Sequence, residues 1–592
     1  MIGDVHQKSG LSQAGRFLGL FSRRRKLQLI MLVALMIAGA IAEVATLGLI
    51  VPFLAIVFDP AQALGNNIVK QFADLFGVSS PAALLPAVTL SFTLVAILTA
   101  AVRILLVYAN SRFIFGIGSE LSSDAYRRTL YQPYAVHISR NTSEVVGTIK
   151  VKLDAVITLV LQPALTVISS SIIAVAIAAA LFYIDPIVAS IALFGFGGIY
   201  LCVVLALRGR LRRISADLSR QQGLTVRAIQ EGLSGIRDVI LGGAQEKYTT
   251  AYRRADYPLR RAAATLSFLP QTVRYVVEGA AMVLIAVVAY LLASQAGSAA
   301  TSIPLLGALA LGGQRLLPVV QQLFASWSSI VGHSRYLSDV LDLLTQPLPE
   351  RSGALPELAL PFERSIELRN VSYRYNLDGP EAIRNVSISL RCGARIGLMG
   401  PTGGGKSTLA DIIMGLLEPQ SGQVLVDGTV LTPDNIANWQ RNVAHVPQSI
   451  YLLDGSFADN IAIGDANQVP TAARLLSAAK NSQIASLISG SKLGIDTGVG
   501  ENGVRLSGGQ KQRIGIARAL FKGASLLVLD EATSALDNET ESAVMQAIEG
   551  DSGDLTIVII AHRLSTLQNC DIIYKVDGGR IVSSGSYAEM VL

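Results

Sequence analysis

The feature that most constrains this chain is a series of long apolar segments in its first half. Apolar residues make up 51% of its 592 residues and charged residues only 16%, and the apolar excess lies in these segments. Each is near or above the roughly 20 residues that cross about 30 Å of hydrocarbon. The six segments are 27–58, 84–111, 155–184, 186–207, 266–293 and 301–331. The pattern predicts an all-α transmembrane domain of six long helices.

The connections between these predicted spans differ in charge. Connections 112–152 and 208–261 are rich in Lys and Arg, whereas those near Asp185 and at 294–300 carry almost none. By the positive-inside rule the basic connections are cytosolic, and so are both termini. The basic connections also have helical periodicity and few breakers, so we expect the membrane helices to continue into the cytosol. Membrane orientation explains the net charge of +6, and we expect no nucleic-acid partner.

Two segments near the N-terminus bear on the membrane topology. The first apolar run is far longer than the h-region of a signal peptide, so we expect a retained helix. The predicted external connection 59–83 places Ile68, Phe72 and Phe76 on one helical face. This pattern is typical of an amphipathic helix that lies on the outer leaflet, or of one that covers the external mouth of the bundle.

After about Phe362 the composition changes to that of a soluble α/β domain, with short strands, Gly turns and amphipathic helices. A chain of this length has room for more than one domain. We therefore expect a multidomain protein with a cytosolic N-terminal segment at 1–26 and a transmembrane domain at 27–331. A linker at 332–364 and a soluble α/β domain at 365–592 follow.

A phosphate-binding motif opens the first helix of the predicted soluble domain. Residues 400–407 read Gly-Pro-Thr-Gly-Gly-Gly-Lys-Ser, which fits G-x-x-x-x-G-K-[ST]. The motif follows an apolar strand at 394–399 and precedes a predicted helix that runs through Leu417. Because the motif has the strand–turn–helix context that its chemistry needs, we assign it to ATP and predict that 365–592 is an α/β P-loop ATP-binding domain.

The residue types in this motif each have a task. Backbone N–H groups around Gly400, Gly403 and Gly405 can wrap the phosphates, whose charge the helix N-terminus favours. Lys406 can reach the β and γ oxygens. Ser407 supplies a hydroxyl to Mg²⁺, and the adjacent Thr408 is assigned to the nucleotide.

A second apolar strand, at 526–529, ends in the acidic pair Asp530-Glu531. In P-loop ATPases, the first carboxylate of such a pair belongs to the magnesium shell, and the second lies beside the attacking water. The simpler alternative is an acidic helix cap after a strand, which is common for a single Asp but less so for an Asp-Glu pair. We therefore expect hydrolysis and not only nucleotide binding.

Between these motifs, residues 506–510 read Leu-Ser-Gly-Gly-Gln, which resembles the signature of the ATP-binding cassette (ABC) family. The resemblance implies that Ser507, Gly508, Gly509 and Gln510 contact the γ-phosphate that is bound by an opposite subunit. Hydroxyl and N–H donors at a helix N-terminus suit that task. The resemblance thus implies two domains closing around two ATP molecules, with a second identical chain as partner.

Four further residues match family positions, and the resemblance covers 365–592. It implies that Tyr375 stacks on adenine, that Asp537 lines the dimer seam and that His562 contacts the γ-phosphate. It also implies that the catalytic residue Gln448 senses magnesium and connects to the membrane unit. A lone Tyr or His is more often a core or surface residue. The shared spacing is what favours the functional roles.

Six spans ahead of one cassette resemble an ABC exporter half-transporter. The resemblance implies outward transport of cargo by a homodimer that alternates between two states. A multidrug, lipid or peptide exporter is the main alternative, and an ATP-gated channel or sensor is another. Intact Glu531 and His562 favour the transporters, because a pure switch does not need hydrolysis chemistry.

Arginines within or near the predicted spans are the clearest indication of cargo. Ionisable residues in a membrane are costly and mark transport pathways. We therefore predict that Arg103, Arg274 and Arg315 contact an anionic substrate. Internal pairing is the alternative, because Glu278 lies one turn from Arg274 and Glu43 lies in the first span, whereas Arg103 and Arg315 have no acidic residue nearby in their own segments.

The last predicted span also carries a polar stripe. Arg315, Gln322 and Ser329 recur every seven residues, with Ser326 close to the same line. Residues with this spacing share one face of a helix. We expect this face to point into the bundle.

The membrane arginines, the 59–83 segment, the Arg-Leu-Leu-Pro run at 315–318 and the Ser-Ile-Tyr-Leu-Leu stretch at 449–453 together resemble PglK-type lipid-linked oligosaccharide flippases. This resemblance implies an amphiphilic polyprenyl-pyrophosphate glycan as cargo and the bacterial inner membrane as location. The sequence does not determine the identity of the substrate or the transport stoichiometry. It also does not determine whether the two chains of the dimer are identical, or whether 59–83 contacts the cargo.

Overall fold

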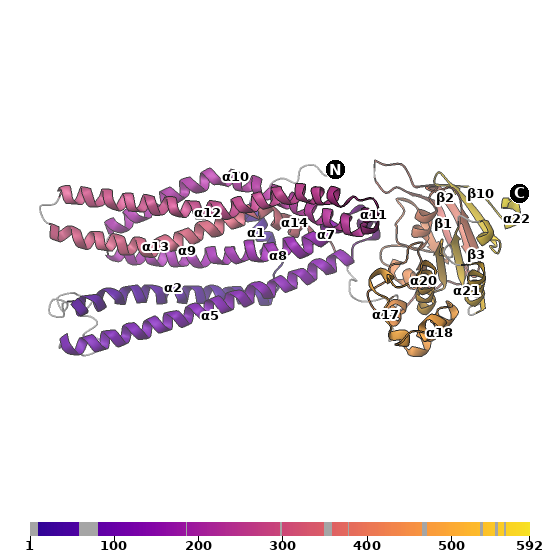
Figure 1. Ribbon diagram of the computed structural model, residues 1–592, viewed down its shortest axis with the longest axis horizontal. Helices are drawn as coiled ribbons and strands as arrows, with labels where there is room; N and C mark the ends of the chain where they lie inside the picture. Colours follow the sequence, from indigo (N-terminus) through magenta and orange to yellow (C-terminus); the bar gives the residue numbers. More distant parts are fainter. Residues whose placement is uncertain are drawn as a thin grey trace. The chain divides into compact units, whose positions relative to one another are not determined.

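The computed structural model of the chain divides into two compact units (Figure 1). The first unit contains Met1–Gln132 and Arg140–Leu348, and the second contains Pro133–Ser139 and Pro349–Leu592. The structure describes residues 10–58, 81–184, 186–295, 299–348, 358–376, 378–463, 470–532, 537–550, 555–561 and 564–591. The predicted external segment 59–83 lies almost wholly outside these ranges.

The first unit is dominated by long helices, which contain five of the six predicted spans whole and most of the sixth, 155–184. They are α2 (Arg23–Phe58), α5 (Pro81–Leu130), α9 (Gln162–Ile184), α10 (Pro186–Ser234), α12 (Gln245–Gln295) and α13 (Ala299–Gly332). The shorter helices are α1 (Gly10–Gly19), α7 (Thr142–Gly147), α8 (Leu153–Val156), α11 (Ile236–Leu241) and α14 (Ser334–Leu344). Helices α5, α10 and α12 continue far into the basic connections, which confirms the helical extensions that the periodicity predicted.

The surface of the long helices is apolar. Within the described residues, three helical stretches are long and apolar enough to cross a membrane: Arg23–Thr46, Leu85–Leu130 and Thr142–Ala180. On α5, Leu94 and Ile104 are 67% and 71% exposed. Exposing many such side chains to water would be unfavourable, whereas hydrocarbon accepts them. Their exposure therefore indicates a lipid-facing surface.

Two π-helical turns precede α9, namely η1 (Thr148–Lys152) and η2 (Ile157–Leu161). The Ser329 hydroxyl on α13 donates a 2.7 Å hydrogen bond to the Leu159 carbonyl in η2. Farther along, the Ser170 hydroxyl on α9 donates to the side-chain oxygen of Gln322 at 3.3 Å. Two members of the predicted polar stripe thus hold α13 against the neighbouring helix. The Arg315 side chain lies outside the described part of the chain.

The predicted linker 332–364 contains α14, which packs into the first unit. Tyr336, Val340 and Leu344 on α14 are buried in the same core as residues of α1 and α5. This face is apolar at helical spacing, so the segment forms a helix and buries it. The part of the linker at 349–357 is not described.

The second unit contains two sheets. The six-stranded sheet has the order β10-β9-β3-β8-β7-β6, and the four-stranded sheet has the order β2-β1-β4-β5. The strands are β1 (Ser365–Tyr373), β2 (Ile383–Arg391), β3 (Arg395–Met399), β4 (Ser421–Val426), β5 (Thr429–Val430), β6 (Val443–Val446), β7 (Leu526–Asp530), β8 (Thr556–Ile560), β9 (Ile572–Asp577) and β10 (Arg580–Gly585). Strands β3, β6, β7, β8 and β9 pair in parallel, and their burial on both faces explains their continuous apolar sequence.

Short helices and turns complete the second unit. They are α6 (Tyr134–Ser139), α15 (Lys406–Ile413), α16 (Ile436–Arg441), α17 (Phe457–Ala462), α18 (Ala472–Asn481), α19 (Ala485–Ser489), η3 (Gly494–Asp496), η4 (Glu501–Gly503), α20 (Gly508–Lys522), α21 (Asn538–Gly550), η5 (Leu564–Leu567) and α22 (Tyr587–Val591). Helix α15 ends at Ile413 and not at the predicted Leu417. Gly415 adopts a φ of +70°, and the Leu416 N–H bonds to the Asp411 carbonyl at 2.8 Å, which closes the helix.

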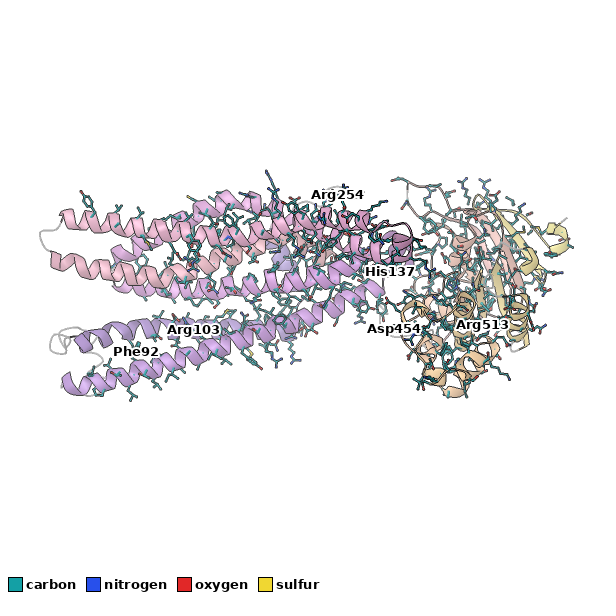
Figure 2. The ribbon with its side chains drawn as sticks, viewed as in Figure 1. Phe92, Arg103, His137, Arg254, Asp454 and Arg513 are labelled. Carbon is teal, nitrogen blue, oxygen red and sulfur yellow. The ribbon has the colours of Figure 1, made fainter. Side chains whose placement is uncertain are left out.

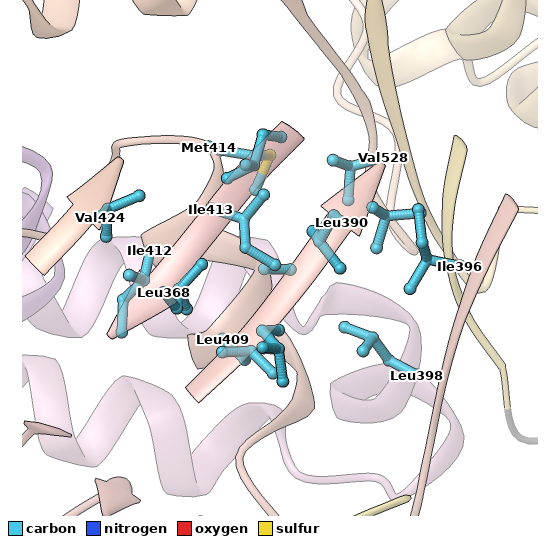
Figure 3. Close-up of a cluster of buried hydrophobic side chains, with 14 of the residues drawn as sticks. Leu368, Leu390, Ile396, Leu398, Leu409, Ile412, Ile413, Met414, Val424 and Val528 are labelled. Atoms are coloured by element: carbon cyan, nitrogen blue, oxygen red, sulfur yellow. The ribbon is translucent and has the colours of Figure 1, made fainter. Parts of the chain in front are cut away.

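The two sheets and α15 share one core (Figure 3). Leu368 and Leu390 of the four-stranded sheet, Ile396 and Leu398 of β3, and Leu409 on α15 are all essentially inaccessible to solvent. Burying a side chain of this size stabilises the fold by about 1.5–3 kcal/mol. The core therefore holds the start of α15 firmly at the end of β3.

Candidate nucleotide-binding site

The sheet order brings the two phosphate-site motifs together. In the central strand β8, Ile560 pairs with Leu398 of β3 on one side and with Asp530 of β7 on the other. Because the carboxyl ends of parallel strands meet at one edge, ligands of open α/β sheets bind there. The loop that begins at Gly400 and the acidic pair that ends β7 thus share this edge.

The loop after β3 needs glycine for its curvature. Gly400 and Gly405 have φ angles of +144° and +105°. A Cβ on Gly400 would lie 2.0 Å from the Val576 carbonyl oxygen, and one on Gly405 would lie 2.7 Å from that of Ala382. Only glycine avoids both the strain and the collision, and the result is a tight loop with its backbone near the helix N-terminus.

Lys406 lies inside this loop. Its Nζ donates hydrogen bonds to the carbonyls of Gly400 at 2.8 Å and Pro401 at 2.9 Å. Burial lowers the pKa of Lys406, and the charges of Glu531 and Asp530 oppose that shift. The ammonium is thus held where phosphate oxygens can replace the two carbonyls as partners.

An open pocket of about 590 Å³ surrounds the loop. It is lined by Tyr375, Ala382, Thr402, Gly403, Gly405, Lys406, Ser407, Thr408, Gln448, Asp530, Glu531 and Ile560. Most of the predicted nucleotide and metal residues therefore surround one space. Thr402, Ala382 and Ile560 were not predicted, and only Thr402 had a sequence signal, as a variable position inside the loop motif.

The hard oxygen donors of this pocket suit Mg²⁺. The Ser407 hydroxyl donates to Oδ2 of Asp530 at 3.4 Å, so a hydroxyl and a carboxylate lie side by side. Mg²⁺ binds few protein ligands and completes its shell with phosphate oxygens and water. No group of three or more His, Cys, Asp and Glu residues suited to a metal occurs in the described ranges. The donor set therefore fits a cation that arrives with the nucleotide.

Glu531 occupies an unusual backbone position. Its φ is +49°, a left-handed conformation that costs a non-glycine residue about 1–2 kcal/mol. Its N–H bonds to the Ile560 carbonyl at 3.1 Å, and its Oε2 accepts a 2.7 Å hydrogen bond from Nε2 of Gln448. Strain of this kind concentrates at functional sites. The carboxylate is thus fixed by both its backbone and a neighbouring amide.

Tyr375 forms one wall of the pocket. Its ring meets the buried Tyr373 edge-on, with centroids 5.2 Å apart, and its hydroxyl lies 3.0 Å from Oγ1 of Thr408. The side chain is still 47% exposed. A ring fixed at its edge and hydroxyl can offer its face to an aromatic base.

The signature residues form a separate feature at the start of α20. Ser507 caps the helix, because Gln510 N–H donates to its hydroxyl at 3.3 Å and Ser507 N–H donates to Oε1 of Gln510 at 2.8 Å. Gly508 and Gly509 begin the helix. These residues are not among the lining residues of the pocket in the same chain.

Asp537 and His562 complete the predicted set. The Asp537 carboxylate accepts bonds from the Thr540 N–H at 2.9 Å and from the Thr540 hydroxyl at 2.8 Å, and these bonds lower its pKa. Asp537 does not line the pocket either. His562 lies outside the described residues.

The structure pairs both predicted substrate arginines whose side chains it describes. Arg103 on α5 (Figure 2) forms an ion pair with Glu43 on α2. Nε of Arg274 lies 2.8 Å from Oε1 of Glu278, one turn along α12. Arg103 has no acidic residue nearby in its own segment, and the structure supplies one from another helix. Internal pairing therefore holds for both, although their side chains remain 59% and 57% exposed.

Comparison with known proteins agrees with this architecture. Residues 383–534 match the ABC transporter family, and residues 47–311 match the ABC transporter transmembrane region. An ATP-dependent lipid A-core flippase of Albidiferax ferrireducens is 30% identical over 502 residues, which are 83% of this chain and 84% of that protein. One of Haemophilus influenzae is 32% identical over 406 residues, 68% of each chain.

The solved structures give the same fold. The structure of a bacterial Atm1-family ABC exporter with ATP bound superimposes with a TM-score of 0.75 over 96% of each chain. At 24% sequence identity this similarity concerns the fold alone. It includes both the helical unit and the α/β unit.

Proposed function

Because the chain belongs to the ABC transporter family and is an ATP-hydrolysing transporter of the exporter type, we propose that it moves an amphiphilic lipid across a bacterial inner membrane. Its ATPase domain and both termini are cytosolic in this proposal. The observation that carries the proposal is the convergence of Lys406, Ser407, Asp530 and Glu531 on one pocket, in a chain whose other unit consists of long helices with an apolar surface.

Each residue of the pocket has a defined task in hydrolysis. Lys406 and the loop N–H groups bind the phosphates, and Tyr375 stacks on the base. Ser407, Asp530 and Gln448 would hold Mg²⁺, which would neutralise phosphate charge. Glu531 orients and polarises the attacking water, and His562 contacts the γ-phosphate. The hydrogen bond from Gln448 keeps Glu531 in position for this task.

The working unit in this proposal is a homodimer. The helix cap formed by Ser507 and Gln510 offers a hydroxyl and N–H groups but does not line the pocket of its own chain. Asp537 is likewise outside that pocket. A second identical chain would bring these residues to the γ-phosphate, which gives two hydrolysis sites that both keep Glu531.

The proposed cargo is an anionic lipid-linked oligosaccharide. Relatives named lipid A-core flippases support a lipid cargo, and the apolar helix surfaces suit a cargo that stays partly in the bilayer. Arg103 and Arg274 are ion-paired but largely exposed, so each guanidinium keeps N–H donors for a phosphate. An apolar drug or a peptide is the second candidate, and it would not require these arginines.

The test is ATP turnover of the purified protein in liposomes with and without a polyprenyl-pyrophosphate oligosaccharide. We expect the lipid to change the ATP turnover of the wild type. We expect Glu531→Gln to abolish ATP hydrolysis. A wild-type turnover that is normal but indifferent to the lipid would remove the proposed cargo and leave the ATPase assignment intact.

A further inference from the structure

Three helices of the first unit meet at a polar cluster that hydrolysis does not use. Helices α10, α12 and α13 pack against one another (Figure 1). The cluster consists of Tyr200 on α10, Arg274 and Glu278 on α12, and Gln321 on α13. Polar and ionisable side chains within membrane spans mark function by default.

Glu278 is the centre of this cluster. Its Oε1 accepts hydrogen bonds from Nε of Arg274 at 2.8 Å and from Nε2 of Gln321 at 3.0 Å. Its second oxygen, Oε2, bonds to none of the described residues, and the side chain is 28% exposed. One acceptor of the carboxylate therefore remains available beside the paired one.

Tyr200 supplies an unused donor to the same place. The residue is only 6% exposed, and its hydroxyl has no hydrogen-bond partner within the described ranges. Tyr200 packs in one buried cluster with Val273 and Val277 of α12, the neighbours in sequence of Arg274 and Glu278. Its ring packs against Phe324 with centroids 5.8 Å apart, a contact that a phenylalanine would make equally well. Packing therefore does not explain why a buried position carries an unpaired hydroxyl.

The cluster has matched donors and acceptors and no net charge. Arg274 and Tyr200 donate, Oε2 of Glu278 accepts, and the Arg274 and Glu278 charges cancel. A phosphate oxygen can accept from Arg274 but offers no donor to Oε2 of Glu278, whereas a hydroxyl group both donates and accepts. The cluster therefore provides for hydroxyl groups in addition to the phosphate contact of Arg274.

We propose that Tyr200, Arg274, Glu278 and Gln321 form a cargo subsite that binds the sugar hydroxyls of a lipid-linked substrate and so determines specificity for glycosylated lipids. This inference rests on the proposed lipid transport. A purely structural tie between α12 and α13 accounts for the bond from Gln321 to Glu278. Among the described residues, it leaves the Tyr200 hydroxyl and the Glu278 Oε2 without a partner.

Two matched probes test the subsite with the full-length protein in liposomes, namely polyprenyl pyrophosphate with one attached sugar and the same lipid without it. For Tyr200→Phe we expect the concentration of the sugar-bearing lipid that half-maximally changes ATP turnover to rise about threefold to tenfold. The response to the sugar-free lipid should stay as in wild type. Glu278→Gln should shift the sugar-bearing response in the same direction. Tyr290→Phe, on the exposed part of α12, is the control and should change neither response.

The outcomes separate the subsite from the transport proposal. A Tyr200→Phe protein that responds to both lipids like Tyr290→Phe, or that shifts equally for both, would overturn the subsite. So would a wild type that does not distinguish the two lipids. A wild type that hydrolyses ATP but ignores both lipids would remove the proposed lipid cargo together with the subsite. Because Tyr200→Phe removes an unpaired hydroxyl, we expect this variant to fold.

Discussion

The side-chain amide of Gln448 donates a 2.7 Å hydrogen bond to the carboxylate of Glu531. The two residues are far apart in sequence, but each follows one of two paired parallel strands, in which Val446 of β6 lies opposite Leu529 of β7. The register of the sheet therefore determines this contact. It joins the residue assigned to magnesium with the residue assigned to water.

Replacing Glu531 should stop hydrolysis without stopping ATP binding. We expect Glu531→Gln to lower ATP turnover by about 10²- to 10⁴-fold, the range for loss of a general base. An amide has nearly the same shape but cannot polarise water in the same way. Gln448→Ala should cause a smaller loss, because it frees the carboxylate of Glu531 and removes one proposed Mg²⁺ ligand but keeps the general base. Turnover and nucleotide affinity would be measured on the same samples, and a Glu531→Gln protein with near wild-type turnover would refute the assignment.

The stability of the nucleotide-free protein should depend on Asp411. Burial, with a smaller contribution from the charge of Asp530, raises the pKa of Asp411 from 3.8 to about 6. The folded state thus keeps a proton that the unfolded state releases, so this contribution to stability is complete below pH 3.8 and is lost as the pH rises to about 6.

Asp411→Asn removes this titration. We expect its Tm to exceed that of wild type at pH 7 and the difference to shrink towards pH 4.5. The exposed Asp378 of the same unit gives the control variant Asp378→Asn. Thermal unfolding at the two pH values measures the effect. An equal Tm difference at both pH values would contradict the role of the Asp411 proton.

A buried ion pair should make the first unit sensitive to Asp339. Its Oδ2 accepts bonds from Nζ of Lys152 at 2.7 Å and from the Ser219 hydroxyl at 2.5 Å, and its Oδ1 lies 3.3 Å from Nε of Arg335. Lys152 is only 7% exposed. Asp339→Asn leaves this cation without its carboxylate and should destabilise the protein by about 3–5 kcal/mol.

Lys152→Met should cost less, because Arg335 and Ser219 still contact Asp339. Thermal unfolding in detergent compares the two variants, with Lys150→Met as a control on an exposed neighbouring lysine. If Lys152→Met lowered the Tm as much as Asp339→Asn does, the claim that loss of the carboxylate costs more stability than loss of the cation would be wrong.

The pairing of Arg103 makes a simple alanine variant ambiguous. Arg103→Ala removes the guanidinium that Glu43 contacts in the bundle, and we expect a loss of roughly 1–3 kcal/mol from this effect alone. Replacing both residues by glutamine should restore most of that stability. A cargo contact of Arg103 predicts that both variants lose the response of ATP turnover to the lipid. A double variant that regained the full response would assign Arg103 to structure only.

The nucleotide site was predictable because its chemistry is local. The loop from Gly400 to Ser407 needs a strand before it and a helix after it, and each is readable from a short pattern. The same holds for Asp530 and Glu531 at the end of an apolar strand. The error at Leu417 arose because Gly415 closes the helix early, and a single glycine in a helical pattern does not reveal its φ angle.

Contacts between helices of the first unit were not predictable. Periodicity indicates which residues share a face of one helix but not which helix meets that face. The pairs of Arg103 with Glu43 and of Lys152 with Asp339 depend on that packing, as does the position of Tyr200 beside Glu278. The π-helical turns before α9 have no signal in composition or spacing, yet they explain the partner of Ser329.

The most direct test of the central claim is ATP-driven movement of a lipid-linked oligosaccharide across the bilayer of liposomes that contain the purified protein. The fraction of the lipid accessible from each side would be measured over time, with wild type and Glu531→Gln compared at equal protein density. Our account predicts that the wild type moves the lipid only when MgATP is present and that Glu531→Gln does not. Equal movement by both proteins, or none by a wild type that hydrolyses ATP in response to the lipid, would contradict it.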